Sequence, residues 1–174
     1  TIYNQGNILR QCKQTSDDGY IGIGDNLIEQ WDSDILLIKS DSLGNEQWRQ
    51  FYGEPNLIVD YGYSIVETYN NGYLLGGYKY LASGSIEYGD PIMIMVDSIG
   101  NVIWEKNLGA EFPDTHAAVC NSIDSNIIVG TTIGESMYAG ADPIRKIQIH
   151  KYDYAGGLIW KKNYGAAEIW NSLE

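Results

Sequence analysis

Short runs of apolar residues, each ended by turn-forming residues, recur along the whole chain, and almost no segment has the period of an amphipathic helix. In the middle of the chain this pattern predicts four strands, at 61–69, 73–80, 91–98 and 101–108. Apolar residues run almost without interruption through 92–96 and, earlier, through 35–39. Strands covered on both faces have this pattern, so we expect the two runs at the centres of their sheets. The pattern predicts an all-β fold.

Turn residues mark the hairpins between these strands. The pairs Asp18-Gly19 and Asn71-Gly72 predict two-residue hairpin turns, in which both central residues have positive φ. Between the third and fourth strands stand Gly44, Gly100 and Gly156, where a tight turn favours a residue without Cβ.

The same phrase occurs three times in strict register. Trp48, Trp104 and Trp160 lie 56 residues apart, each within the pattern Asp-x-x-Gly-x-x-x-Trp-x-x-x-x-Gly, which ends at Gly53, Gly109 and Gly165. A second phrase precedes it, as Asp18-Gly19-Tyr20, Asn71-Gly72-Tyr73 and the degenerate 125–127. The phrases predict repeats at 1–53, 54–109 and 110–165, with 166–174 the start of a further unit.

Four antiparallel strands in about 56 residues, with one repeated tryptophan, are typical of a β-propeller blade. We expect each indole to lie between blades and its N–H to donate to a backbone carbonyl. A parallel β-helix and a β-sandwich are the competing all-β folds; a β-helix coil is shorter than this period, and a sandwich does not require the same tryptophan three times. Propellers have about four to eight blades. Residues 1–174 are therefore expected to form one propeller segment, part of a larger propeller or closed into a ring by a second copy.

Composition fits one folded domain with an acidic surface. The 174 residues are 44% hydrophobic and carry a net charge of −12. Such a charge argues against nucleic acid as a partner, because no basic patch is present to replace the counterions of phosphates. The longest apolar runs are far too short to cross a bilayer, so no membrane insertion is expected.

The sequence contains no recognisable catalytic, metal-binding or cofactor-binding motif, so no catalytic residue, metal or cofactor is predicted. When the repeats are aligned, Cys12 and Cys120 match two adjacent positions of the first strand, whose side chains point to opposite faces of a sheet. We therefore expect two buried small side chains and no disulfide between them. His116 and His150 stand apart from any ligand set. The repeated Asp41, Asp97 and Asp153 are expected to cap turns by accepting hydrogen bonds from backbone N–H groups.

Differences between the repeats indicate where a ligand could bind. The connection between the second and third strands lengthens from repeat to repeat, and the connection from the fourth strand to the next blade also varies. In a propeller both connections lie at the mouth of the channel, where ligand sites are usual. Aromatic side chains beside carboxylates suit recognition of a glycan or a protein. The candidate binding residues are Trp31, Asp32, Tyr88, Asp90, Asp114, His116, Tyr138 and Trp170, with Tyr80, Glu87 and Asp142 in the same connections.

Two other interpretations of these residues stay open. Tyr80, Tyr88 and Tyr138 would equally serve to pack long loops onto the blade. A hydrolase built on a carboxylate pair such as Asp32 and Asp90 is an alternative, because the separation of two carboxylates decides that chemistry.

The phrases at 18–21, 34–48 and 60–68 resemble the tandem propeller repeats of secreted and surface proteins from Bacteroidetes-type bacteria. This resemblance covers all three repeats and implies a secreted or cell-surface protein that serves adhesion or binding. The Asp, Gly and Trp phrase is also similar to the tryptophan-docking motif of quinoprotein dehydrogenases and related outer-membrane assembly propellers, although its Asp-to-Gly turn is one residue shorter. Catalytic quinoproteins carry adjacent cysteines, whereas this chain has only Cys12 and Cys120.

Three functions follow as hypotheses. The first is a non-catalytic binding or adhesion module. The second is a propeller enzyme, either a glycan-active hydrolase or lyase or a quinoprotein-like oxidoreductase. The third is an intracellular scaffold, which the expected lack of disulfides would suit.

Overall fold

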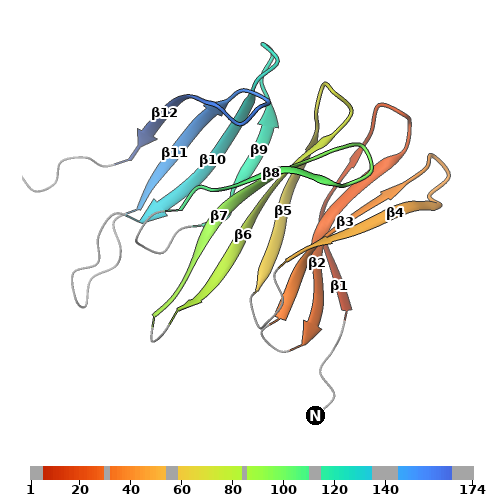
Figure 1. Cartoon of the computed structure of the whole chain (residues 1–174), viewed down its shortest axis with the longest axis horizontal. Coiled ribbons are helices and arrows are strands. Elements are labelled where there is room, and N and C mark those ends of the chain that lie inside the picture. The colour runs from red at the N-terminus through yellow and green to blue at the C-terminus, as the bar shows by residue number, and fades with distance from the viewer. Residues whose placement is uncertain are drawn as a thin grey trace, which may run out of the picture.

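The computed structural model describes residues 6–29, 32–53, 59–83, 86–109, 115–134 and 145–165. They form three four-stranded antiparallel sheets in which the strands follow one another in chain order (Figure 1). The first sheet contains β1 (Gly6–Gln14), β2 (Tyr20–Glu29), β3 (Asp32–Ser40) and β4 (Glu46–Tyr52); the second contains β5 (Asp60–Glu67), β6 (Tyr73–Ser83), β7 (Ile86–Val96) and β8 (Val102–Asn107); the third contains β9 (Ala118–Asn121), β10 (Ile127–Gly134), β11 (Arg145–Tyr152) and β12 (Leu158–Tyr164). The predicted all-β fold with three four-stranded repeats is confirmed.

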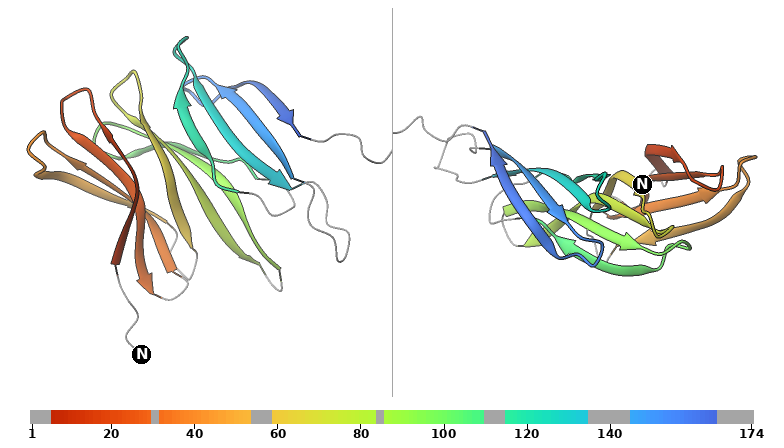
Figure 2. Two further views of the ribbon diagram at one scale, coloured as in Figure 1. Left: turned by 180° about the vertical axis from the view of Figure 1, so that it is seen from behind. Right: turned by 90° about the horizontal axis from the view of Figure 1, so that it is seen from above.

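The three sheets lie face to face in chain order, an arrangement consistent with propeller blades (Figure 2). The first strand of the second sheet, β5, packs across β1, β2 and β3, and β9 packs against β5 and β6. In the part of the chain that the structure describes, the sheets do not close into a ring, and no helix is long and apolar enough to cross a membrane.

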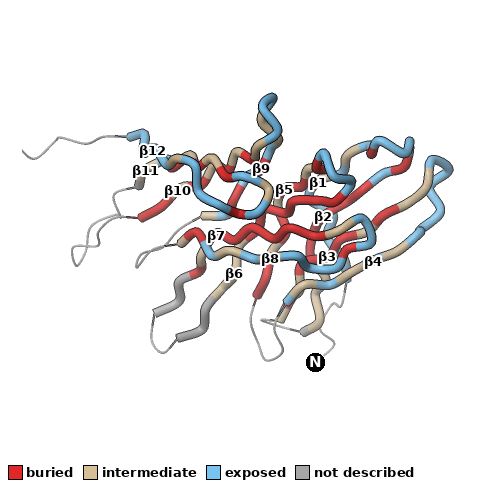
Figure 3. Tube along the Cα trace, turned by 45° about the horizontal axis from the view of Figure 1, so that its top comes forward, coloured by how far each residue is buried: buried red, intermediate tan, exposed pale blue. Residues whose placement is uncertain are grey.

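Two apolar cores join the sheets, one on each face of the second sheet. Leu75 contributes to the core shared with the first sheet, and its neighbour Leu74 to the core shared with the third. Adjacent strand residues point to opposite faces, so β6 is apolar on both. Burial is accordingly concentrated in the central strands, whereas β8 and β12 are largely exposed (Figure 3). The predicted central position of 35–39 and 92–96 is confirmed, since they lie in β3 and β7.

The turns between third and fourth strands also match the sequence prediction. Gly44, Gly100 and Gly156 have φ values of 85°, 87° and 83°, in the left-handed region that favours glycine. Asp97 Oδ1 accepts hydrogen bonds from the N–H groups of Ile99 (3.0 Å) and Asn101 (2.8 Å). Asp41 and Asp153 accept equivalent bonds within their own turns. The three aspartates therefore cap turns, as predicted.

The prediction of two-residue turns between first and second strands is wrong. The Asn71 N–H donates to Thr68 O (3.0 Å) and the Thr68 N–H to Gly72 O (2.9 Å), so three residues separate the paired ends. Within this turn only Asn71 has a positive φ, of 63°. The corresponding residues of the other two sheets, Asp18 and Ser125, also have positive φ. Gly72 has a different role, because a Cβ there would lie 2.3 Å from Val96 O. The glycine permits close approach of the third strand, which a local turn rule does not consider.

The connection predicted between the second and third strands of the second sheet is mostly strand. β6 and β7 pair from Tyr73 opposite Val96 to Ser83 opposite Ile86. Tyr80, Glu87, Tyr88 and Asp90 therefore lie on strands and not in a loop. The aromatic and β-branched residues on both sides of 84–85 favour a long hairpin.

The predicted burial of the two cysteines is also wrong. Cys12 and Cys120 are exposed free thiols. By register Cys12 matches Ile65, which is buried against the first sheet, and Cys120 matches Val66, which packs against the third. Among the described residues no sheet covers the corresponding faces of the first and third sheets, and so both thiols stay open to solvent.

Trp48 and Trp104 each face the sheet that follows. The ring centroid of Trp48 lies 6.0 Å from that of Tyr73 in the second sheet. The Trp104 indole N–H donates to Tyr154 O of the third sheet at 3.0 Å. Trp160 holds the same position on β12, where its ring lies 5.8 Å from Lys162 Nζ.

Candidate functional site: a row of side chains on the first strands

Irregularities in the first strands of the first two sheets project one side chain from each. The pairing of β1 with β2 shifts between Leu9 and Gln11, and that of β5 with β6 shifts between Gly62 and Ser64. Arg10 and Tyr63 are the extra residues at these bulges. An extra residue in one strand redirects its side chain, and bulges of this kind are frequent beside functional sites.

Arg10, Tyr63 and His116 form one stack that crosses all three sheets, which we call the bulge row. The imidazole of His116, two residues before the third sheet's first strand, stacks on the Tyr63 ring with centroids 4.0 Å apart and planes at 18°. Arg10 Cζ lies 4.5 Å from the centroid of Tyr63 and 5.2 Å from that of Tyr61. Tyr63 is therefore in contact with both a guanidinium and an imidazole.

A buried carboxylate holds Arg10 in place. Asp25 is fully buried and accepts hydrogen bonds at Oδ2 from Arg10 Nε (2.9 Å) and Nη2 (2.6 Å). The Gly62 N–H donates to Asp25 Oδ1 at 3.1 Å, which ties the first sheet to the second. This pairing raises the pKa of Arg10. The Arg10 side chain is 28% exposed, so part of it faces solvent in a fixed orientation.

The bulge row is close to electrically neutral. Arg10 is compensated by Asp25. Desolvation and the nearby Arg10 charge lower the pKa of His116, so the imidazole is neutral at pH 7. Burial is the main cause that raises the pKa of Tyr61, which lies beside Arg10. A ligand at the row would therefore meet hydrogen-bond donors and acceptors on the edges of the side chains, and little net charge.

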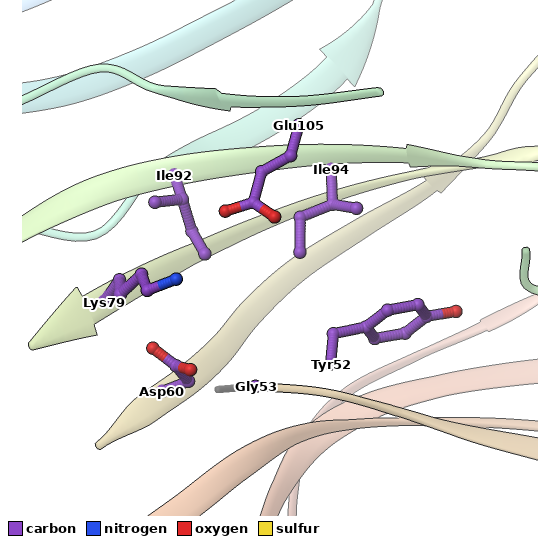
Figure 4. A pocket seen from close by; sticks show the side chains of 7 residues that line it. All are labelled: Tyr52, Gly53, Asp60, Lys79, Ile92, Ile94 and Glu105. Carbon is purple, nitrogen blue, oxygen red and sulfur yellow. The ribbon is translucent and has the colours of Figure 1, made fainter. Parts of the chain in front are cut away.

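A small cavity lies between the first and second sheets (Figure 4). Its volume is about 60 Å³, and it is lined by Tyr52, Gly53, Asp60, Lys79, Ile92, Ile94 and Glu105. The head groups of Asp60, Lys79 and Glu105 face it from the second sheet. This is room for water or one small ion, not for a sugar ring.

A larger hollow of about 300 Å³ lies at the other ends of the same two sheets, beside Trp48 and Tyr73. Its polar groups bond to one another: the Ser16 N–H and hydroxyl both donate to the Glu67 carboxylate, and Lys39 donates to Asp17. These bonds join side chains of the hollow in fixed pairs, so we assign it a structural role.

The structure places only some of the predicted binding residues. Trp31, Asp114, Tyr138 and Trp170 lie outside the described residues, as does Asp142. Asp32 begins β3, and Tyr88 lies on β7. Of the predicted set, His116 alone lies in the bulge row.

Asp90, one of the predicted binding residues, has a counterpart in the first sheet. Its carboxylate accepts a hydrogen bond from Asn107 Nδ2 at 2.6 Å, and a Cβ on Gly109 would lie 2.1 Å from its Oδ1. Asp34 meets Gly53 in the same way in the first sheet. The glycines at 53 and 109 therefore make room for an aspartate that recurs in the first two sheets.

Arg10 and Tyr63 were missed by the sequence argument. Each occupies a bulge. The only trace of a bulge in the sequence is that the first strand has one residue more than the part of the second strand with which it pairs. That signal becomes visible only when the register is known.

Within the described ranges, no group of three or more His, Cys, Asp or Glu side chains is placed to hold a metal ion. Comparison with protein-family models finds no match, and comparison with curated proteins finds none either.

Proposed function

We propose that this chain is a non-catalytic binding module of a secreted or cell-surface protein, which recognises a glycan or a protein. The observation that carries the proposal is the bulge row: three planar side chains, one at each of three successive sheets, held in one partly exposed stack. Hydroxyls of a glycan, or the backbone of a polypeptide, would bond to the polar edges of this row.

Preorganisation supports the proposal. Arg10 is anchored by buried Asp25, and Tyr63 is held between Arg10 and His116. A ligand that binds here orders few side chains, which lowers the entropic cost of association. Because the row is nearly neutral, it favours polar, uncharged groups over phosphates.

Localisation rests on the resemblance of the repeated phrases to surface propeller repeats. The enzyme alternative has no further support from the described side chains, since Asp90 is engaged by Asn107. A secretion signal in the full gene would favour the surface assignment over the intracellular scaffold.

The experiment is a binding screen of the purified chain on immobilised glycans and peptides, followed by calorimetry with any ligand found. We expect Tyr63→Ala and His116→Ala each to weaken binding at least about tenfold. Tyr69→Ala is the matched control, because Tyr69 is 59% exposed on a turn away from the row. Unchanged affinity in both row variants would contradict the proposed site, and turnover of the ligand by the wild-type chain would contradict a non-catalytic function.

A further inference from the structure

Both contacts between neighbouring sheets use one recurring arrangement, in which fourth-strand side chains hold the Asp-x-x-Gly turn of the next sheet. Gln50 Nε2 donates to Ile99 O (3.3 Å) and the Tyr52 hydroxyl to Gly100 O (2.8 Å). A Cβ on Gly100 would lie 3.1 Å from Trp48 Cζ3. The glycine turn of the second sheet therefore lies directly against the first sheet's tryptophan.

The second sheet packs on the corresponding turn of the third through the same two fourth-strand positions, although a different side chain donates the hydrogen bond. Trp104 donates its indole N–H to Tyr154 O in the turn that contains Gly156. A Cβ on Gly156 would lie 2.7 Å from Lys106 Cε and 3.4 Å from Trp104 Cε2. Tryptophan and the residue two positions later thus form a clasp for the following turn.

The third sheet carries a clasp that holds no turn, and the first sheet carries a turn that no clasp holds, among the described residues. Trp160, Lys162 and Tyr164 stand at the positions of Trp48, Gln50 and Tyr52, and Tyr164 is 48% exposed. In the first sheet, a Cβ on Gly44 would meet nothing within 4 Å, and Leu43 is 86% exposed.

Gly130, in the middle of β10, is a second position where the described residues lack a contact that the second sheet makes. It corresponds by register to Gly76, where a Cβ would lie 2.4 Å from Ala117 O of the next sheet. At Gly130 a Cβ would meet no atom of the described residues within 4 Å, and its φ is not positive. A glycine inside a strand costs stability and often marks the close approach of another backbone. The third sheet is therefore shaped to receive a further sheet.

Each of the two faces that would meet carries exposed apolar side chains. On the first sheet, Leu9, Ile38 and Phe51 lie on the face turned away from the second sheet, and Leu9 and Phe51 are 63% and 46% exposed. On the third sheet, Ile147 is 55% exposed on the face that carries Trp160 and Tyr164. Exposed apolar faces of this kind mark interaction surfaces.

We propose that two copies of this chain associate head to tail, with the third sheet of each packed on the first sheet of the other. The Trp160 clasp of one copy then holds the Asp41–Gly44 turn of its partner, and the backbone around Arg10 enters the space above Gly130. The same contact, a clasp on one sheet and a turn on the next, joins the first sheet to the second and the second to the third. Because the chain carries a further clasp and a further turn, a second copy supplies the matching half of each. Two such contacts give a closed ring of six sheets, within the usual range for propellers. The proposal does not depend on the proposed function.

The cysteines provide a built-in test of orientation. Cys120 matches Val66, and Cys12 matches Val119. Val66 packs against the core cluster that contains Val119. Head-to-tail docking therefore brings Cys120 of one copy close to Cys12 of the other, whereas a symmetric face-to-face dimer would pair identical cysteines.

Light scattering of the 174-residue chain over a hundredfold range of concentration should give a mass near twice 19.4 kDa. Gly130→Val is the decisive variant. No described residue occupies the space around Gly130, so the variant should keep the wild-type circular dichroism and thermal midpoint of a single chain. It should weaken association at least tenfold, because the added side chain fills the space that a second copy needs.

Trp160→Ala should also weaken association. Ile159→Ala is the matched control, since Ile159 is the preceding residue on the same strand and is 50% exposed. Mild oxidation with diamide, which takes up two electrons and two protons as two thiols become one disulfide, should link Cys12 to Cys120 between chains. A monomer at every concentration, a dimer insensitive to Gly130→Val, a mass that keeps growing beyond the dimer, or a Cys12–Cys12 link would overturn the proposal.

Discussion

Lys39 Nζ lies 2.9 Å from Asp17 Oδ2, although the lysine side chain is only 3% exposed. The third sheet repeats this ion pair as Lys151 with Asp124. In the second sheet the same two positions hold Met95 and Asn70. Cation and carboxylate are thus both present or both absent, which indicates that each is kept because of the other.

The first prediction tests this pairing. Asp17→Asn should reduce the free energy of unfolding by about 2 kcal/mol, because it leaves the buried Lys39 ammonium without its carboxylate. The double variant Asp17→Asn with Lys39→Met reproduces the second repeat and should recover most of that loss. Urea unfolding of the wild type, both single variants and the double variant measures the coupling.

A coupling of zero would contradict this account. Acid provides an independent check, because the Lys39 hydrogen bond is the main cause that lowers the pKa of Asp17 to about 2. A carboxylate with a depressed pKa stabilises the fold above its ordinary value of 3.8, and this contribution should be lost as pH falls from there toward 2.

The second prediction concerns Arg10. Arg10→Ala should cost about 3 kcal/mol of stability, because it leaves the Asp25 carboxylate buried without its cation. Arg49→Ala is the matched control: Arg49 pairs with Glu46 on the exposed surface, so its loss should cost less than about 1 kcal/mol. Chemical denaturation compares the two. Equal losses would show that burial of Asp25 does not set the energetics of the site.

The third prediction is a dependence of stability on pH that comes from His150. Its side chain is 3% exposed, and desolvation, with Lys161 as the smaller cause, lowers its pKa from 6.5 to about 4. Between these values the unfolded chain binds a proton that the folded chain does not. Stability should therefore fall as pH falls from 6.5 to 4, by at most about 3 kcal/mol.

His150→Ile tests this assignment, because isoleucine stands at the matching position of the second sheet, Ile94. Urea midpoints measured at intervals between pH 7 and pH 4 should show a flatter dependence in the variant than in the wild type. A variant with the wild-type slope would assign the pH dependence to other groups.

The fourth prediction separates the two roles of the turn glycines. Gly44 and Gly100 have nearly equal φ, 85° and 87°, so alanine at either position should cost about 1 kcal/mol of backbone strain. At Gly100 the added Cβ would also lie 2.5 Å from Gln50 Cγ, and Gly100→Ala should cost about 1–3 kcal/mol more. Thermal unfolding at a concentration where the chain is monomeric measures the difference. Equal costs would mean that the contact between sheets does not constrain the turn.

Much of the fold followed from the sequence alone. The spacing of Trp48, Trp104 and Trp160, the apolar third strands and the turn residues specify the repeats, because period, alternation and turn chemistry act over a few residues at a time. The capping role of Asp97 and its equivalents was accessible for the same reason.

The remaining features depend on which residues meet across sheets, and these contacts are visible only in the folded molecule. Glycine is required at position 72 because Val96 approaches its backbone closely, and not because its φ is positive. Cys12 is exposed because no described sheet packs on its face of the first sheet. The bulge row requires strand register and the order of sheets, since Arg10, Tyr63 and His116 are each more than 50 residues from the next. Local sequence preferences do not encode such distances, so the scaffold could be predicted and its candidate site could not.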